Sequence, residues 1–467
     1  MSKINFNASK IVLLLLAIFS AIFFGLISLT LVSLVGEKYA YLLALPLATL
    51  ICLIFIFDRY MFFMLVILSR ASLDVAFNAI KLGSFGLGAV LNALVILIAL
   101  LTLLEKSRVQ YQGLKTVRLA WTIFLTLAGC SLVYAPTILS SIKVFLLFVS
   151  YASMMMIGLH VVKNDADFGK WLKAIVYSSI IPALYGIYSM AFGGGGARLS
   201  LGEGFRVQST FPHPNSYAFY LVLVISLTFY LYKTKVLISI NPVIKRILPI
   251  YILVLIGLLI MTKTRSAWVA CYLFFLLYGL FFERKFLFIL FFMSVVALFI
   301  PDVQDRLLDL QKGTDFGASG YAKLNSYAWR KKYWADAINW MSKSHYLTGY
   351  GVSSFLHYSP EFGMANAFSK QNIEINAHSV YVQLFFELGI LGVLSFIFLM
   401  YAHIKNLYAI YQKNKLLVFT AIVLFVEYLF ESYSDNLLDY LIYNWYLSFF
   451  FGLAFAYVSK QDKEKVI

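Results

Sequence analysis

The chain has 467 residues, of which 61% are hydrophobic and 18% aromatic, while only 13% are charged. This composition excludes a soluble globular protein and is typical of a polytopic helical membrane protein. The formal charge of +16 does not indicate nucleic-acid binding, because the Lys and Arg residues lie mostly in short loops between apolar runs.

The apolar runs are continuous and long enough to cross a bilayer as helices, which predicts an all-α fold in one integral membrane domain over residues 1–467. The first run, from Ile11 to Val35, is too long for the apolar core of a signal peptide and is expected to remain as a span. Charged residues and glycines crowd the join between 60–79 and 85–104, where a re-entrant pair is the alternative. We therefore expect about 12–14 transmembrane helices. The predicted helices cover residues 11–35, 39–57, 60–79, 85–104, 118–135, 139–162, 171–192, 215–232, 247–262, 266–282, 286–300, 378–402, 416–432 and 436–457.

The short basic loops set the orientation of the chain in the membrane. They fall on one side when the predicted spans are counted, and the positive-inside rule makes that side the cytoplasm. Both termini are then cytoplasmic, and two long polar segments, 193–214 and 301–377, face outward. The basic groups are Lys106, Arg108, Lys115, Arg118, Lys233, Lys235, Lys245, Arg246, Arg284, Lys285, Lys405, Lys413, Lys415, Lys460, Lys463 and Lys465.

The outer segment 301–377 contains an amphipathic pattern. Its apolar positions are Trp329, Tyr333, Ala337 and Trp340, at helical spacing. Basic residues, beginning with Arg330, occupy other faces of the same helix. This pattern predicts a helix lying in the plane of the membrane interface, and a helix packed on the protein is the alternative.

Four basic side chains lie on the predicted outer face, against the positive-inside trend: Arg198, Arg206, Lys263 and Arg265. A cation kept there at a helix end needs an anionic partner, and the planar guanidinium fork suits the paired oxygens of a phosphate. For each of these residues taken alone, the alternative is a basic side chain at the membrane interface that extends into water without a ligand. Their occurrence on the same face as a histidine favours an anion site at Arg206 and Arg265.

That histidine is His378, which closes the polar segment 301–377 and, with Ser379, opens the apolar run 378–402. A histidine at this boundary titrates near neutral pH, is accessible to a substrate and is held by a membrane helix. It is therefore the candidate catalytic residue, and a structural role at the start of a helix is the alternative.

Residues 204–215 lead directly into a predicted span. Pro214 disfavours helix at His213, and Asn215 is placed to cap the following helix, which would hold Arg206 on a rigid loop. His213 is expected to be structural.

Five carboxylates accompany the last helices. Glu387 lies nine residues after His378, too far along a helix to contact it, and is expected to bond a neighbouring helix or line a cavity. The other four recur every four residues near the outer surface and are expected to be helix-end polar residues. Binding of an acceptor sugar and orientation of His378 are the alternatives. These four are Glu427, Glu431, Asp435 and Asp439.

Sequence motifs for metal or nucleotide binding are absent. Cys52, Cys130 and Cys271 all fall inside apolar runs and are expected to be core residues, without a disulfide or a metal. No Walker loop, dinucleotide-binding glycine pattern, zinc motif or nucleophile elbow occurs. We therefore predict no cofactor, so the substrate must carry the energy for any group transfer.

Taken together, these residues resemble the O-antigen ligase and polymerase superfamily of bacterial envelope membrane proteins. A His-[Asn/Ser/Gln]-x9-Gly-x-x-Gly signature is met by His378, Ser379, Gly389 and Gly392. The signature is moderately specific by itself, and its coincidence with two outward arginines strengthens the resemblance.

Three further segments agree in order. The segment from Arg206 to Asn215 is similar to an Arg…Phe-x-x-Pro-Asn segment, and the run from Arg265 to Val269 resembles an Arg-x3-Leu motif with valine in place of leucine. The stretch 334–355 resembles an outer-loop helix followed by a Gly-x-Gly turn. The resemblance covers residues 200–400.

The resemblance implies an enzyme that transfers a glycan from an undecaprenyl diphosphate carrier to an acceptor hydroxyl, at the outer face of the bacterial cytoplasmic membrane. Arg206 and Arg265 would bind the diphosphate, and His378 would act as general base on the hydroxyl or hydrogen-bond the diphosphate. The reaction would need no metal and would invert the anomeric carbon. The expected supporting residues are Lys263, Asn215, Ser379 and Arg330.

The acceptor stays open among another lipid-linked glycan (a polymerase), lipid A-core (a ligase) and a protein hydroxyl (an O-oligosaccharyltransferase). The polymerase is favoured, because the outer segment shows no additional soluble acceptor domain. A lipid-linked glycan transporter, the alternative from another class, would need polar residues and broken helices at mid-membrane depth, whereas the polar residues here gather at one face.

Overall fold

The computed structural model describes residues 50, 53–79, 81–82, 85–105, 114–193, 197–200, 204–234, 242–308, 325–362 and 374–464. The chain divides into two compact units, Met1–Ser69 and Arg70–Ile467, and every candidate site residue belongs to the second. The predicted span 11–35 lies outside the described residues, as does 39–57 apart from residues 50 and 53–57.

The described residues form helices joined by short turns, with two small antiparallel hairpins. The α-helices are α3 (Arg59–Arg70), α4 (Asp74–Ala79), α5 (Leu87–Leu104), α6 (Lys115–Ser131), α7 (Ile138–Val161), α8 (Asp165–Tyr177), α9 (Ile180–Phe192), α10 (Pro214–Lys233), α11 (Pro242–Met261), α12 (Arg265–Phe281), α13 (Lys285–Ala297), α14 (Pro301–Leu308), α15 (Ser326–Trp340), α16 (Ser354–Tyr358), α18 (Val380–Ala409), α19 (Lys415–Glu431) and α20 (Leu441–Glu464). The strands are β1 (Lys81–Leu82), β2 (Phe85–Gly86), β3 (Ala197–Ser200) and β4 (Gly204–Val207), and short 3-10 turns include η9 (Leu437–Asp439).

The predicted all-α membrane fold is confirmed. Within the described ranges, seven helices are long and apolar enough to cross a membrane, α8 and α9 counting together as one, and α12 and α13 are apolar but shorter. The expected span 60–79 is instead two helices, because α3 ends at Arg70 and α4 begins at Asp74. The Arg70 guanidinium donates to the Asp74 carboxylate at 2.6 Å, so two charges that would interrupt an apolar span neutralise each other at the break.

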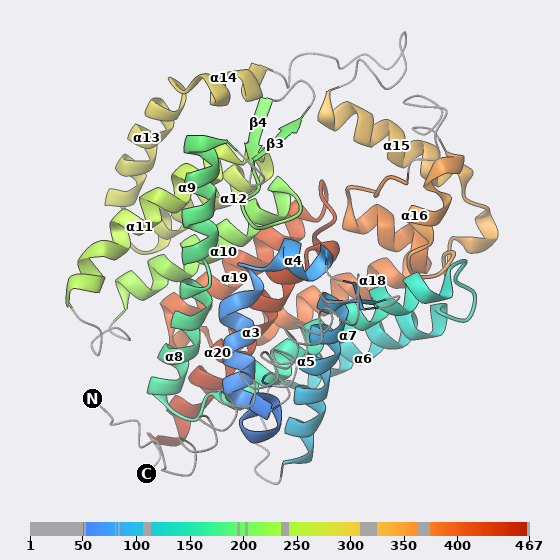
Figure 1. Cartoon of the computed structure of the whole chain (residues 1–467), viewed down its shortest axis with the longest axis horizontal. Coiled ribbons are helices and arrows are strands. Elements are labelled where there is room, and N and C mark those ends of the chain that lie inside the picture. The colour runs from blue at the N-terminus through green and yellow to red at the C-terminus, as the bar shows by residue number, and fades with distance from the viewer. Residues whose placement is uncertain are drawn as a thin grey trace, which may run out of the picture. The chain divides into compact units, whose positions relative to one another are not determined.

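Helix α10 lies at the centre of the second unit, in contact with α11, α12, α19 and α20 (Figure 1). Its side chains are mostly apolar or aromatic, and every residue from Pro214 to Leu231 is buried. A membrane helix that is hydrophobic all round can be covered by lipid or by protein, and α10 is covered by protein. The segment just before Pro214, which carries Arg206, is therefore attached to the most completely packed helix of the unit.

Helices α7 and α20 approach closely through a pair of glycines. A Cβ added at Gly158 would collide with the carbonyl oxygen of Phe449, and one added at Gly452 would collide with that of Met155. Small residues let the backbones of membrane helices pack against each other, which fixes the middle of α20 relative to α7.

Helix α18 is interrupted at Gly389, where φ is +65°. The turn that precedes α16 inserts into the break. The amides of Tyr350 and Gly351 donate to the carbonyl oxygens of Phe386 and Glu387, at 3.0 and 2.8 Å. Carbonyls that a broken helix would leave unpaired are thereby satisfied by the outer segment.

Two glycines make this insertion possible. Gly349 also has a positive φ, +69°, and a Cβ there would collide with the backbone of Glu387. A Cβ at Gly389 would in turn collide with the backbone of Leu347. Gly389, which belongs to the His378 signature, and Gly349, in the turn before α16, therefore form the two sides of one backbone contact.

We expect Gly389→Ala to destabilise the protein and to abolish transfer activity, because alanine must adopt a left-handed conformation at a cost of about 1–3 kcal/mol and must also displace the Leu347 backbone. Thermal unfolding of the purified protein in detergent measures the effect. Gly257→Ala is the matched control, since its Cβ meets nothing within 4 Å and alanine favours the interior of α11. Equal melting temperatures for the two variants would contradict this account.

Helix α15 packs on the protein through the face that the sequence predicts. Tyr333 and Ala337 are fully buried in a cluster with Phe355 and Phe386. The indole of Trp334 also donates to the Ala377 carbonyl oxygen at 2.7 Å. The packed alternative therefore describes this helix, and its depth relative to a bilayer interface stays a prediction.

The described cysteines differ from the expectation at one position. Cys271 is buried, as predicted, but Cys130 is exposed on α6. Both thiols are free, and Cys52 lies outside the described residues. The apolar run around Cys130 predicts only that α6 is hydrophobic, and an exposed apolar face is ordinary for a helix that borders lipid.

Candidate active site

His378 is held at the start of α18 by backbone geometry and ring packing. Its φ is +50°, in the left-handed region, and Ser379 follows as the N-cap of the helix. The imidazole packs edge-on against Trp329 of α15, with ring centroids 5.3 Å apart. The buried Nδ1 has no hydrogen-bond partner among the described residues, so this ring nitrogen retains an unused capacity to accept or donate a proton.

Burial lowers the pKa of His378 to about 4, and the Arg330 guanidinium lowers it as well. Asp435 acts in the opposite direction, and His213 adds a smaller lowering effect. The ring is therefore neutral at pH 7, which is the state that a general base needs.

Arg330 is brought to the same place, as expected for a supporting residue. Its guanidinium carbon lies 5.6 Å from the centre of the Trp329 ring, and its Nε is buried without a hydrogen-bond partner in the described part of the chain. Arg330 thus adds a cation beside His378.

Arg206 is buried at the end of β4, and its guanidinium donates hydrogen bonds to both flanking segments. Nε donates to the Thr262 carbonyl oxygen at 2.8 Å, and Nη2 donates to Asn215 Oδ1 at 2.7 Å and to Thr264 Oγ1 at 3.1 Å. The guanidinium therefore joins the loop before α10 to the turn between α11 and α12. β3 pairs with β4 in antiparallel register, so Arg198 lies opposite Arg206 in this hairpin.

The turn that receives Arg206 leads directly to Arg265. Lys263 adopts φ +54°, and α12 begins at Arg265, the residue after Thr264. The start of a helix presents unpaired amides and a partial positive charge, both of which favour an anion. The structure thus brings Arg206 and the two predicted cations of this turn, Lys263 and Arg265, to one region.

Asn215 does not cap α10, contrary to the expectation. The N-cap is His213, whose Nδ1 accepts from the Asn215 amide at 3.1 Å, with Pro214 in the first turn. The Asn215 side chain instead accepts from Arg206 and donates to Asp435 Oδ2 at 2.6 Å. A capping side chain must turn back toward its own helix, whereas buried Asn215 faces two charged partners.

Asp435 and Asn436 continue this chain of hydrogen bonds to the catalytic candidate. Asp435 Oδ1 accepts from the Tyr440 hydroxyl at 2.7 Å and from the Asn436 amide at 2.9 Å. Asn436 Oδ1 accepts from the Ser379 amide at 2.7 Å. An unbroken buried network therefore runs from Arg206 to the residue that follows His378.

This network shows which carboxylates matter to the site. Asp435 is linked through Asn436 to the Ser379 amide, which favours the alternative that it orients His378, and Asp439 accepts from Asn436 Nδ2 at 3.1 Å. Glu427 and Glu431 are buried, and Glu431 is the last residue of α19, which agrees with a polar residue at a helix end. The carboxylate of Glu387 lies against the backbone of Ser353 and Phe355, which agrees with a bond to a neighbouring helix.

Non-glycine residues with positive φ gather around this network. Of four in the described ranges, Lys263 and His378 belong to the site and Ser209 follows Arg206 by three positions. Such conformations cost free energy and persist where the surrounding structure imposes them. No three His, Cys, Asp or Glu side chains in the described ranges are grouped so that they could hold a metal ion.

The family of O-antigen ligases has a model that matches residues 250–397. This match confirms the resemblance stated from the sequence, and it includes Lys263, Arg265, Arg330, His378 and Ser379. Arg206 and the network residues Asn215 and Asp435 lie outside the matched range. No curated protein matches the chain.

Proposed function

We propose that this chain, as a member of the O-antigen ligase and polymerase superfamily, transfers a glycan from an undecaprenyl diphosphate carrier to an acceptor hydroxyl at the outer face of the bacterial cytoplasmic membrane. The observation that carries the proposal is the buried network from Arg206 to Ser379, because it couples a cation cluster to a neutral histidine. The cation cluster would stabilise the charge on a departing diphosphate, and the neutral histidine would take the proton of an acceptor hydroxyl.

The reaction is a single displacement. The acceptor oxygen forms a bond to the anomeric carbon of the donor glycan while the bond from that carbon to the diphosphate oxygen breaks. His378 takes the hydroxyl proton, and the diphosphate leaves with the bonding electrons. Attack opposite the leaving group inverts the anomeric centre, and the phosphate ester supplies the energy, so the proposal requires neither nucleotide nor metal.

Arg206 and Arg265 are proposed to neutralise the charge that develops on the diphosphate. A fixed guanidinium is already oriented before the reaction, which makes such stabilisation effective in a site with little water. Arg206 is fixed by Thr262, Thr264 and Asn215. Lys263, in the turn before α12, and Arg330, near His378, add further positive charge.

An apolar cavity of about 600 Å³ supports this placement of the donor. It is bounded by α10, α11, α12 and α13, and Trp268 and Val269 of α12 line it. Val269 follows Arg265 by one helical turn, so the two residues share a face of α12. An isoprenoid chain in this cavity would have its diphosphate next to Arg265.

The acceptor is proposed to be another lipid-linked glycan, which makes the protein a polymerase of surface polysaccharide repeat units. Ligation to lipid A-core is the second candidate, because the matching family model is that of the O-antigen ligases. A protein acceptor is the third.

The surface glycans of a strain that lacks this protein distinguish the polymerase from the ligase. A polymerase deletion should leave single repeat units on the cell surface, whereas a ligase deletion should leave a core without attached glycan and lipid-linked polymer in the membrane. Electrophoresis of extracted glycans separates the two, and complementation by the wild-type gene is the control. Wild-type glycan length and abundance in the deletion strain would contradict the proposed function.

A further inference from the structure

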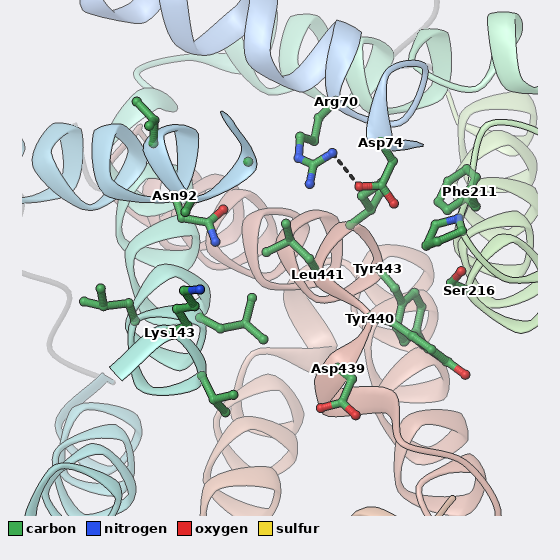
Figure 2. Close-up of a pocket in the computed structure, with 18 of the residues that line it drawn as sticks. Arg70, Asp74, Asn92, Lys143, Phe211, Ser216, Asp439, Tyr440, Leu441 and Tyr443 are labelled. Carbon is green, nitrogen blue, oxygen red and sulfur yellow. Dashed lines mark hydrogen bonds and ion pairs between the residues drawn. The ribbon is translucent and has the colours of Figure 1, made fainter. Parts of the chain in front are cut away.

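A second cavity, of about 680 Å³, borders the buried network through Asp439 and Tyr440 (Figure 2). Its walls are α4 and α5, the first turns of α7, residues 211–216 and residues 439–443. Its volume is in the usual range for small-molecule sites, about 300–1,000 Å³. Neither Arg206 nor Arg265 is among the residues that line it.

The cavity presents hydrogen-bond donors and acceptors from opposite walls. Figure 2 shows Asn92 of α5 and Lys143 of α7 directed toward each other at one end, and Asp439 and Tyr440 at another. The Arg70–Asp74 pair also lines the wall, but its two charges neutralise each other at 2.6 Å.

Apart from His213 and Ser216, the rest of the wall is apolar or aromatic. Phe211 and Tyr443 line it together with aliphatic side chains of α5 and α7. A few converging polar groups within a largely apolar cavity are the usual make-up of a site for a small polar ligand. Sugars fit such a site because they carry hydroxyls around an apolar ring.

Two cavity residues connect this space to the reaction centre. Asp439 accepts from Asn436, which in turn accepts from the Ser379 amide beside His378. Tyr440 donates to Asp435, which is linked through Asn215 to Arg206. His213 also lines the cavity and lies close enough to His378 to influence its pKa. The network thus links the cation cluster to the cavity.

We propose that this cavity binds a sugar of the acceptor glycan, and that Lys143 and Asn92 determine acceptor specificity by hydrogen-bonding hydroxyl or acetamido groups of that sugar. The inference rests on the proposed glycan transfer and extends it by giving donor and acceptor separate sites. Lys143 lies in the second turn of α7, and it is proposed to act through acceptor binding alone.

The test is a two-substrate assay with purified full-length protein. The donor is labelled lipid-linked glycan extracted from the deletion strain, and the acceptor is the repeat-unit oligosaccharide released from that lipid by mild acid. We expect Lys143→Met and Asn92→Leu each to raise the KM for the oligosaccharide about tenfold, since each loses one or more hydrogen bonds. The KM for the donor should change less than about twofold, because its proposed partners are untouched.

Filling the cavity provides a variant that spares all polar groups. Ala93 of α5 lines the cavity and is exposed, so Ala93→Phe should also raise the acceptor KM. Leu97→Phe is its matched control, since it lies one turn further along the same helix face and outside the cavity. Lys115→Met, at the opposite end of α6 from the outer segment, is the control for loss of a lysine, and Lys143→Arg should restore part of the acceptor affinity.

The outcomes separate this inference from the proposed function. A wild-type protein that never consumes the donor contradicts both. An unchanged acceptor KM in Asn92→Leu and Ala93→Phe, or a rise in donor KM instead, overturns the acceptor site alone.

Discussion

Replacing His378 by asparagine is expected to reduce the rate of glycan transfer by about 10²–10⁴, the usual contribution of a general base. Asparagine is preferred to alanine because it tolerates the left-handed conformation that His378 adopts, at φ +50°. The loss should then report the missing imidazole and not a displaced α18. His357→Asn, an exposed histidine of α16, is the matched control and should retain full activity.

The pH dependence of kcat/KM gives an independent measurement of the same group. Because burial and the Arg330 charge lower the pKa of His378 to about 4, its neutral form persists well below the ordinary histidine range. Activity should therefore hold as pH falls through 6.5 and decline only as it approaches about 4. Wild-type rates in His378→Asn would remove this residue from the mechanism, and a decline centred near 6.5 would contradict its buried neutral state.

The same shift predicts a stability effect with a definite sign. In the unfolded chain His378 binds a proton below about 6.5, whereas the folded protein resists that proton down to about 4. Its contribution to stability is therefore complete above 6.5 and is lost as pH falls through that window. Comparison of melting temperatures at pH 7 and pH 5 should show a smaller decrease for His378→Asn than for the wild type.

Arg265→Lys and Arg206→Lys are each expected to reduce transfer by roughly 10- to 100-fold, which corresponds to one lost charge-assisted hydrogen bond. An ammonium keeps the positive charge but cannot hold a diphosphate at two points, so retention of charge alone should not rescue activity. The double variant should lose less than the product of the two single losses, because both residues act on one leaving group.

The Arg206→Lys and Arg265→Lys variants should differ in melting temperature. Arg206 donates to Thr262, Thr264 and Asn215, so lysine there also breaks the network, and its melting temperature should fall. Arg246→Lys, an exposed residue of α11, is the matched control for both substitutions. An in vitro assay with lipid-linked donor decides the matter: full activity in Arg265→Lys would show that charge suffices, and full activity in Arg265→Ala would place the diphosphate elsewhere. Arg198→Lys is expected to remain active.

The sequence by itself determined the all-α membrane fold and the candidate residues Arg206, Arg265 and His378. Long apolar runs must be removed from water, and cations on the outer face of a membrane protein usually have an anionic partner. Each feature can be recognised within a single segment of the sequence. The prediction of one span over 60–79 was wrong, because the helix breaks between Arg70 and Asp74. Hydropathy does not show that these two residues pair with each other.

Only the tertiary structure decided how these residues work together. Asn215 and Asp435 are 220 positions apart, and nothing local distinguishes an asparagine that caps a helix from one that bridges an arginine to a distant carboxylate. Likewise, Gly389 and Gly349 are required because two backbones touch, and Lys143 lines a cavity because α5 and α7 pack side by side. Hydrophobic burial is a property of each segment, whereas a hydrogen bond or a close contact needs its partner, and the fold alone supplies that partner.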